Sequence, residues 1–220
     1  MINLSKVKPA MNKKPLAILI SSILLSTFAV ANDDHTSIER MSVIGSKEDL
    51  RKSTGSVTLI DELELEKFEY DDIGRILASV PGVNIRQEDG YGLRPNIGFR
   101  GVTPERSKKI NIMEDGVLIG PAPYSASAAY YFPNTTRMTA IEVTKGPSTI
   151  KFGPNTVAGT LNLISRQVPD SQEAAVDIGL GTDNYGKLHA YYGDTVGDFG
   201  FLVEGLHFKA DGFKAIDGGG

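Results

Sequence analysis

Cysteine is absent from this 220-residue chain, which excludes disulfide bonds, thiol catalysis and zinc sites built on cysteine ligands. Long apolar runs are also absent after residue 31, where no stretch approaches the roughly 20 residues that a membrane-spanning helix needs. Excess positive charge is lacking too, because the formal net charge is −4, opposite in sign to that of a typical nucleic-acid-binding domain. We therefore expect neither a helical membrane protein nor a nucleic-acid partner.

Motifs of catalysis and metal binding are missing as well. The histidines His35, His189 and His207 are far apart in the sequence and lack the spacing of metal ligands. Gly-rich phosphate loops, zinc motifs and nucleophile elbows do not occur. We expect no enzyme activity, no bound metal and no cofactor.

The first 31 residues have the pattern of a secretory signal peptide. Lys13-Lys14 precede an apolar run from Leu16 to Val30, which closes on the small-x-small sequence Ala29-Val30-Ala31. A buried core helix is the alternative interpretation. The segment before the apolar run is basic and contains no acidic residue, which is unusual for a core helix. Both Met1 and Met11 fit as the true start. We expect an exported protein.

Three regions follow the predicted cleavage site. Residues 32–52 are polar except for the apolar island Met41–Ile44, so we expect an extended, mobile segment. Residues 53–166 predict a small α+β domain. Residues 71–80 carry apolar side chains at helical spacing, whereas residues 57–59, 140–145 and 159–165 read as strands and residues 109–119 as a hairpin that turns at Asp115-Gly116.

Residues 167–220 predict three alternating strands, joined first by a short turn at Asp183-Asn184 and then by a longer loop over Gly193–Gly200. This pattern is typical of a transmembrane β-barrel, although a soluble β-meander fits it equally well. The third strand has apolar residues on both faces, so its lipid-facing side is undecided. Three strands cannot close a barrel in lipid, and we therefore expect the chain to be the N-terminal part of a longer protein.

An ordered series of motifs resembles the plug domain of TonB-dependent outer-membrane receptors. The series runs Arg100-Gly101, Met113–Gly116, Ile141–Pro147, Phe152-Gly153 and Ala158–Ile164. Phe152 replaces the usual tyrosine. Ala158 replaces a glycine, so the backbone there must avoid positive φ.

The resemblance implies an α+β plug domain (53–166) followed by the first strands of an antiparallel transmembrane β-barrel (167–220), which would have about 22 strands when complete. It also implies a monomer in the lipid of the Gram-negative outer membrane and a partnership with TonB, the energy-transducing protein of the inner membrane. The segment that resembles a TonB box comprises Glu39, Arg40, Met41, Ser42, Val43, Ile44 and Gly45.

Arg100 and Lys145 match, by the same resemblance, two basic plug positions that pair with barrel carboxylates and hold the plug in place. Such partners would lie beyond residue 220. Lysine at position 145 supplies a point charge without the bidentate fork of arginine, and ordinary surface charges are the alternative interpretation.

Two stretches, Asn96–Arg100 and Gly120–Tyr124, resemble ferric-citrate receptors within the family. The resemblance therefore implies energised uptake of a ferric chelate, either ferric citrate or a related siderophore. Uptake of another metal chelate or of cobalamin, and a soluble periplasmic binding module, are the alternatives. The residues expected at the ligand-facing apices of the plug are Arg94, Asn96, Tyr124, Ser125, Ser127, Tyr130 and Tyr131.

Overall fold

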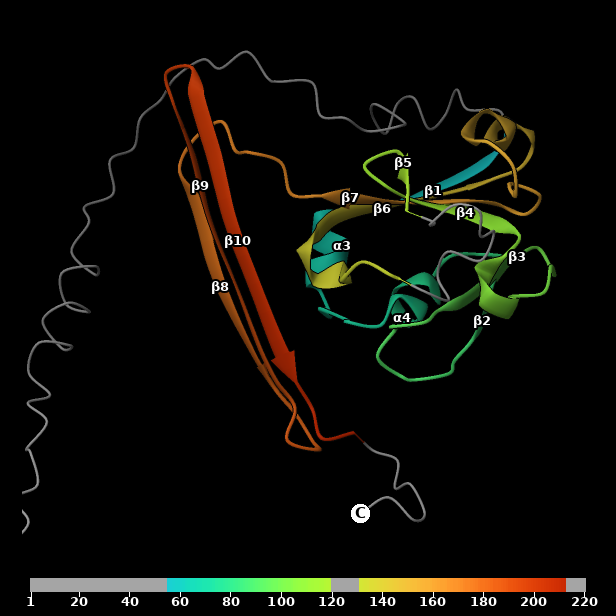
Figure 1. Ribbon diagram of the computed structural model, residues 1–220, viewed down its shortest axis with the longest axis horizontal. Helices are drawn as coiled ribbons and strands as arrows, with labels where there is room; N and C mark the ends of the chain where they lie inside the picture. The colour runs from blue at the N-terminus through green and yellow to red at the C-terminus, as the bar shows by residue number, and fades with distance from the viewer. Residues whose placement is uncertain (1–54, 120–130, 213–220) are drawn as a thin grey trace, which may run out of the picture. The chain divides into compact units, whose positions relative to one another are not determined.

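The computed structural model describes residues 55–119 and 131–212 of the chain. The predicted signal peptide (1–31) and the predicted TonB box (39–45) lie outside the described residues. Within the described ranges, no helix is long and apolar enough to cross a membrane. The described strands form sheets of five, three and two strands, which can be followed in Figure 1.

The five-stranded sheet contains all the strands that alternation predicted between residues 57 and 165. Its order is β1-β6-β7-β4-β5, and only the β4–β7 pair is parallel. Figure 1 shows the helices α3 and α4 together on one side of this sheet. The strands are β1 (Ser56–Ile60), β4 (Ile110–Glu114), β5 (Val117–Leu118), β6 (Met138–Lys145) and β7 (Gly159–Ser165).

The predicted helix over residues 71–80 is confirmed in place but is shorter. It is α4 (Ile73–Leu77). Asp72 begins it, because its carboxylate accepts a hydrogen bond of 2.8 Å from the backbone N–H two residues later. The helix cannot continue to Pro81, which has no N–H, and Gly82 turns the chain at φ 74°. The first and last helical residues and Val80 are buried, as the spacing predicts.

Some elements were not foreseen from the sequence. One is a hairpin of two four-residue strands, β2 (Val83–Arg86) and β3 (Asn96–Phe99). Another is the five-residue helix α3 (Glu62–Glu66), which Asp61 begins by accepting a hydrogen bond at its carboxylate. Every residue of β3 is buried, so this strand has no apolar–polar alternation for a sequence pattern to detect.

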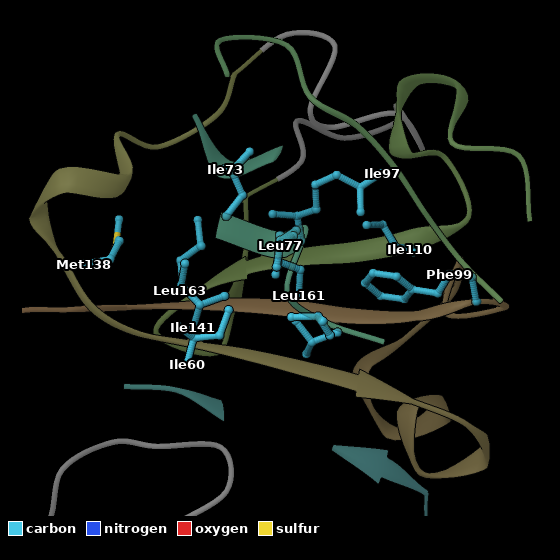
Figure 2. Close-up of a cluster of buried hydrophobic side chains, with 14 residues drawn as sticks. Ile60, Ile73, Leu77, Ile97, Phe99, Ile110, Met138, Ile141, Leu161 and Leu163 are labelled. Atoms are coloured by element: carbon cyan, nitrogen blue, oxygen red, sulfur yellow. The ribbon is translucent and has the colours of Figure 1, made fainter. Parts of the chain in front are cut away.

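The hydrophobic core lies between α4 and the five-stranded sheet. Figure 2 shows Ile73 and Leu77 of the helix directed toward Ile141, Leu161 and Leu163 of the sheet. All five side chains are fully buried. Each contributes about 1.5–3 kcal/mol relative to an exposed side chain, so this packing is the main source of stability for the α+β unit.

The C-terminal part forms a separate antiparallel sheet in the order β10-β9-β8. Its strands are β8 (Glu173–Leu180), β9 (Gly186–Val196) and β10 (Phe199–Lys209). The three predicted strands are therefore confirmed, but the predicted order of their connections is wrong. The first connection is the longer one, residues 181–185, and the second has two residues, Gly197 and Asp198.

Two glycines caused this error, because Gly193 and Gly200 were interpreted as loop residues and both lie in strands. Packing explains Gly193. A Cβ atom there would lie 2.6 Å from the Pro169 ring, so only glycine allows the incoming chain to approach β9 this closely.

Leu161→Ala should lower the free energy of unfolding of the α+β unit by about 2–5 kcal/mol, because it leaves a cavity under α4. The measurement is urea unfolding followed by a probe in this unit. Leu63→Ala is the matched control, since Leu63 is 79% exposed and its truncation should change stability by no more than about 0.5 kcal/mol. Equal effects of the two substitutions would contradict the assigned core.

Candidate functional site

The loop between β2 and β3, residues 87–95, is organised by one carboxylate. Asp89 accepts hydrogen bonds from the backbone N–H groups of Tyr91 at 2.8 Å and Arg94 at 2.9 Å. Gly90 and Gly92 take positive φ values of 80° and 72°, which allow the chain to wrap around this carboxylate. The side chain of Arg94 is exposed, and its role as a ligand contact stays a prediction.

Asn96 does not occupy the exposed position that was expected of it. It is only 1% exposed, its amide donates to Glu88 Oε2 at 2.8 Å, and its carbonyl oxygen accepts from the Arg106 N–H at 2.8 Å. Both ends of the side chain are therefore engaged, as buried polar groups generally are. The structure corrects this prediction: Asn96 joins the base of the loop to the segment before β4.

The second predicted apex is described only at its end. Tyr131 is 51% exposed, whereas Tyr124, Ser125, Ser127 and Tyr130 lie outside the described residues.

The Asp115-Gly116 motif has a structural role in the hairpin of β4 and β5. Both residues have positive φ, 49° and 79°, as a type I′ turn requires. The turn is joined to β7, because Asp115 accepts from the N–H and hydroxyl of Ser165 and the Gly116 N–H donates to Asn162 Oδ1 at 2.9 Å. These motif residues therefore hold the sheet together.

Gly159 shows why a glycine is needed at the start of β7. Its φ is 151°, and a Cβ atom would lie 2.3 Å from the Thr144 carbonyl oxygen. Ala158, which replaces a glycine of the family motif, has no positive φ. The expectation for Ala158 is confirmed.

Lys145 and Arg100, the predicted latch residues, lie near each other but differ in environment. Lys145 is 2% exposed, and its ammonium group donates to the Pro81 carbonyl at 2.7 Å. Burial lowers the pKa of Lys145, and the positive charge of Arg100 lowers it further. Arg100 is exposed and has φ 51°. Within residues 55–119 and 131–212 neither forms an ion pair with a carboxylate, so the latch role stays a prediction.

The two faces of the three-stranded sheet differ sharply in chemistry. One face is exposed and mainly apolar. Val203 belongs to it, because Val203 pairs with Tyr192, which pairs with Ala174. His207 and Lys209, near the end of β10, share this face. This register settles the orientation of the third strand. The exposed fractions of the large apolar residues on this face are Val176 66%, Ile178 73%, Leu180 85%, Leu188 49%, Tyr192 41%, Val196 68%, Phe199 70% and Val203 67%.

The opposite face carries charged groups that contact each other and the α+β unit. His189 lies between Asp177 Oδ2 at 3.2 Å and Glu204 Oε1 at 2.8 Å. Arg166, which follows β7, contacts Glu62 of α3 at 2.8 Å and lies 3.8 Å from the centre of the Tyr191 ring. No alternation pattern predicted these pairings, since the partners are far apart in sequence.

Comparisons with known proteins agree with this architecture. The family model "TonB-dependent Receptor Plug Domain" matches residues 49–160. A protein named vitamin B12 transporter BtuB of Photobacterium profundum is 26% identical over 93% of this chain and 33% of its own length. The homologous transporter of Vibrio vulnificus is 25% identical over 94% of this chain. The chain thus spans about a third of the length of the curated relatives it matches.

Solved structures show the same fold. The unliganded ferric citrate transporter FecA aligns with a TM-score of 0.64 at 24% identity, over 80% of this chain and 29% of its own. The siderophore receptor PirA from Acinetobacter baumannii aligns with a TM-score of 0.56 at 22% identity, over 74% of this chain and 26% of its own. Because the family model covers half of the chain and the fold agrees, the chain belongs to the TonB-dependent receptor plug family of the Gram-negative outer membrane.

Proposed function

We propose that the complete protein is a receptor that takes up a ferric chelate across the outer membrane, with ferric citrate as the substrate, and that TonB supplies the energy. The observation that carries this proposal is a plug fold followed directly by a sheet with one apolar, exposed face. An α+β unit that blocks a wide barrel must be displaced before a substrate can pass, and this displacement needs an external source of energy. Residues 39–45 are the proposed attachment point for TonB, because an extended apolar segment can add as a strand to the sheet of a partner.

The apolar face of β8–β10 is the proposed lipid-facing surface. In a transmembrane barrel, apolar residues point to lipid and polar residues to the interior, and periplasmic turns are shorter than outer loops. By this rule the two-residue connection Gly197-Asp198 would lie on the periplasmic side, and residues 181–185 on the outer side.

Exposed arginines around the β2–β3 loop offer contacts to an anionic ligand. Arg86 precedes the loop, Arg94 lies within it, and the backbone N–H of Arg106 contacts its base through Asn96; all three arginines are exposed. Guanidinium groups bind carboxylates through paired, charge-assisted hydrogen bonds. A carboxylate-rich ferric chelate would therefore suit this region. Tyr131 would offer a hydroxyl at the second apex, together with the predicted contacts between residues 124 and 130.

Cobalamin is the second candidate substrate, because the curated relatives are named as vitamin B12 transporters. Cobalamin has no cluster of carboxylates, so the exposed arginines would contribute little to its binding. The two candidates differ in their dependence on Arg94, and this difference can be measured.

Val176→Lys should prevent stable insertion of the receptor, because a lysine at the lipid face near the middle of the membrane costs about 2–4 kcal/mol. Ala175→Lys is the matched control: it lies next in sequence, faces the other way, and would be near Glu62 and Asp177. The measurement is the amount of full-length receptor in the outer-membrane fraction. Equal insertion of both variants would show that the apolar face does not meet lipid.

Cells that produce the full-length receptor should accumulate iron supplied as ferric citrate, and Arg94→Gln should weaken its binding by about tenfold or more through loss of a charge-assisted contact. Cyanocobalamin uptake is measured in parallel. If cobalamin enters and ferric citrate does not, the substrate assignment is wrong.

Val43→Pro should abolish energised uptake but preserve ligand binding, because proline removes a backbone donor from the segment proposed to pair with TonB. The measurements are ligand binding and uptake by the same cells. Ser37→Pro, outside the predicted TonB box, is the matched control and should leave both unchanged. Undiminished uptake by Val43→Pro would refute the assignment of the box.

Lys145 provides a test of the proposed latch through the pH dependence of stability. Without a partner carboxylate, its folded pKa is below the unfolded value, so stability rises as pH increases through the folded pKa. With a carboxylate partner from the rest of the barrel, the folded pKa would lie above the unfolded value, and stability would fall as pH increases through it.

The measurement is the urea midpoint of the wild type minus that of Lys145→Met, taken from about pH 8 to pH 11. This range includes the usual lysine pKa. We expect the difference to rise with pH in the 220-residue chain and to fall with pH in the full-length receptor. Lys108→Met, at an exposed pair, is the control and should show almost no slope. A rising difference in both proteins would exclude the pairing.

A further inference from the structure

Asp71, two residues before α4, joins three separate parts of the chain. Its Oδ1 accepts a hydrogen bond from the Thr136 hydroxyl at 3.0 Å and contacts the Lys187 ammonium at 3.3 Å. Its Oδ2 accepts a hydrogen bond from the Tyr185 hydroxyl. Thr136 precedes β6 in the plug, whereas Tyr185 and Lys187 lie at the connection between β8 and β9. One plug carboxylate therefore contacts both the plug and the β8–β9 hairpin of the three-stranded sheet β8–β10, which is called the wall from here on.

Lys187 is held by this carboxylate and by Glu69, whose backbone carbonyl also accepts a hydrogen bond from the ammonium at 3.2 Å. Its side chain is only 4% exposed, and a buried ammonium group is costly unless it is paired. Its other carboxylate partner is Glu69, at 3.2 Å and 46% exposed. Burial raises the pKa of Tyr185, and the hydrogen bond to Asp71 raises it further, which keeps the hydroxyl protonated as a donor. Loss of Asp71 would leave the buried Lys187 ammonium with Glu69 alone and the partly buried Tyr185 hydroxyl without its carboxylate acceptor.

The β2–β3 loop rests directly on the residues beside Asp71. A Cβ atom at Gly92 would lie 3.0 Å from the Asp72 Cα and 3.1 Å from the Ile73 nitrogen, at φ 72°. Asp72 in turn begins α4 through its bond to the Gly74 N–H. Displacement of this loop toward α4 would therefore press on the backbone at Asp72, the residue next to Asp71.

We propose that Asp71, Tyr185 and Lys187 form a releasable latch between plug and wall, and that the β2–β3 loop controls it. This Asp71 latch differs from the Arg100–Lys145 pair in the sign of its charges, since the plug contributes the anion and the wall the cation. It rests on the proposed function, because a latch has a purpose only if the plug must open. Force from TonB, or displacement of Gly92 by a ligand, would separate Asp71 from its two partners.

The test uses the full-length receptor in cells without TonB, and measures influx of vancomycin, a solute too large for general porins. Asp71→Asn, Lys187→Met and Tyr185→Phe should each increase influx, by about tenfold for the two charge removals, as expected for loss of a charge-assisted hydrogen bond. Glu105→Gln, which removes an exposed ion pair with Lys108, should not. Influx is expressed per receptor in the outer membrane, which corrects for a variant that inserts poorly. The three variants change the latch on both its plug side and its wall side.

A double-mutant cycle separates a shared contact from general damage. If Asp71 and Lys187 act through one latch, Asp71→Asn with Lys187→Met should leak no more than the stronger single variant. Multiplied effects would overturn the proposal, and so would wild-type influx in all three single variants.

The coupling to the loop has its own pair of variants. Gly92→Ala should raise influx in the wild-type background and add nothing to Asp71→Asn, because its Cβ presses on Asp72. Gly197→Ala is the matched control, since it has a similar φ of 62° with no atom within 4 Å of the added carbon. Equal influx for these two variants would exclude control by the loop. No transport substrate enters these assays, so failure of the latch is distinct from failure of the proposed function, which would appear as absent ferric citrate and cobalamin uptake by the wild type.

Discussion

The packing of α4 against the five-stranded sheet is the constraint on which the rest of the structure depends. A five-residue helix is far too short to be stable alone, so α4 exists because Ile73 and Leu77 are buried against the sheet. This packing fixes the position at which the helix begins. Asp72 is thereby placed under the β2–β3 loop, and Asp71 is directed toward Lys187. Apolar burial in the plug thus determines where its polar contacts with the wall form.

Local periodicity predicted the parts of the fold that have one buried face. The strands of the central sheet, the Asp115-Gly116 hairpin and the three long C-terminal strands all have short-range patterns that burial on one side imposes. The β2–β3 hairpin escaped prediction for a physical reason. Its strands have four residues each, β3 is buried on both faces, and nine residues separate them. The connections of the long strands were assigned in the wrong order because Gly193 serves packing and not turning.

The candidate site could be predicted only where a motif marks it. The motif series located Lys145 and Arg100, but not their environments, since the burial of Lys145 depends on residues such as Pro81 that are 64 positions away. Asn96 was assigned to the exposed apex from the family resemblance, whereas in the structure its side-chain amide is hydrogen-bonded to Glu88 and to the Arg106 N–H. Asp71 was not singled out at all, because Tyr185 and Lys187 lie 114 and 116 positions later.

Plug and wall meet here through charges that compensate each other. Arg166 lies among Glu62, Glu173 and Glu204, and Lys187 lies between Glu69 and Asp71. An interface of this kind is consistent with the proposed release of the plug. When an apolar interface opens, the newly exposed surface has no favourable partner in water. When a polar contact breaks, water replaces much of it. The net contribution of a typical hydrogen bond to stability is therefore only about 0.5–1.5 kcal/mol. The plug therefore has an apolar interior that keeps it folded and a polar boundary with the C-terminal sheet, as the proposed transport would require.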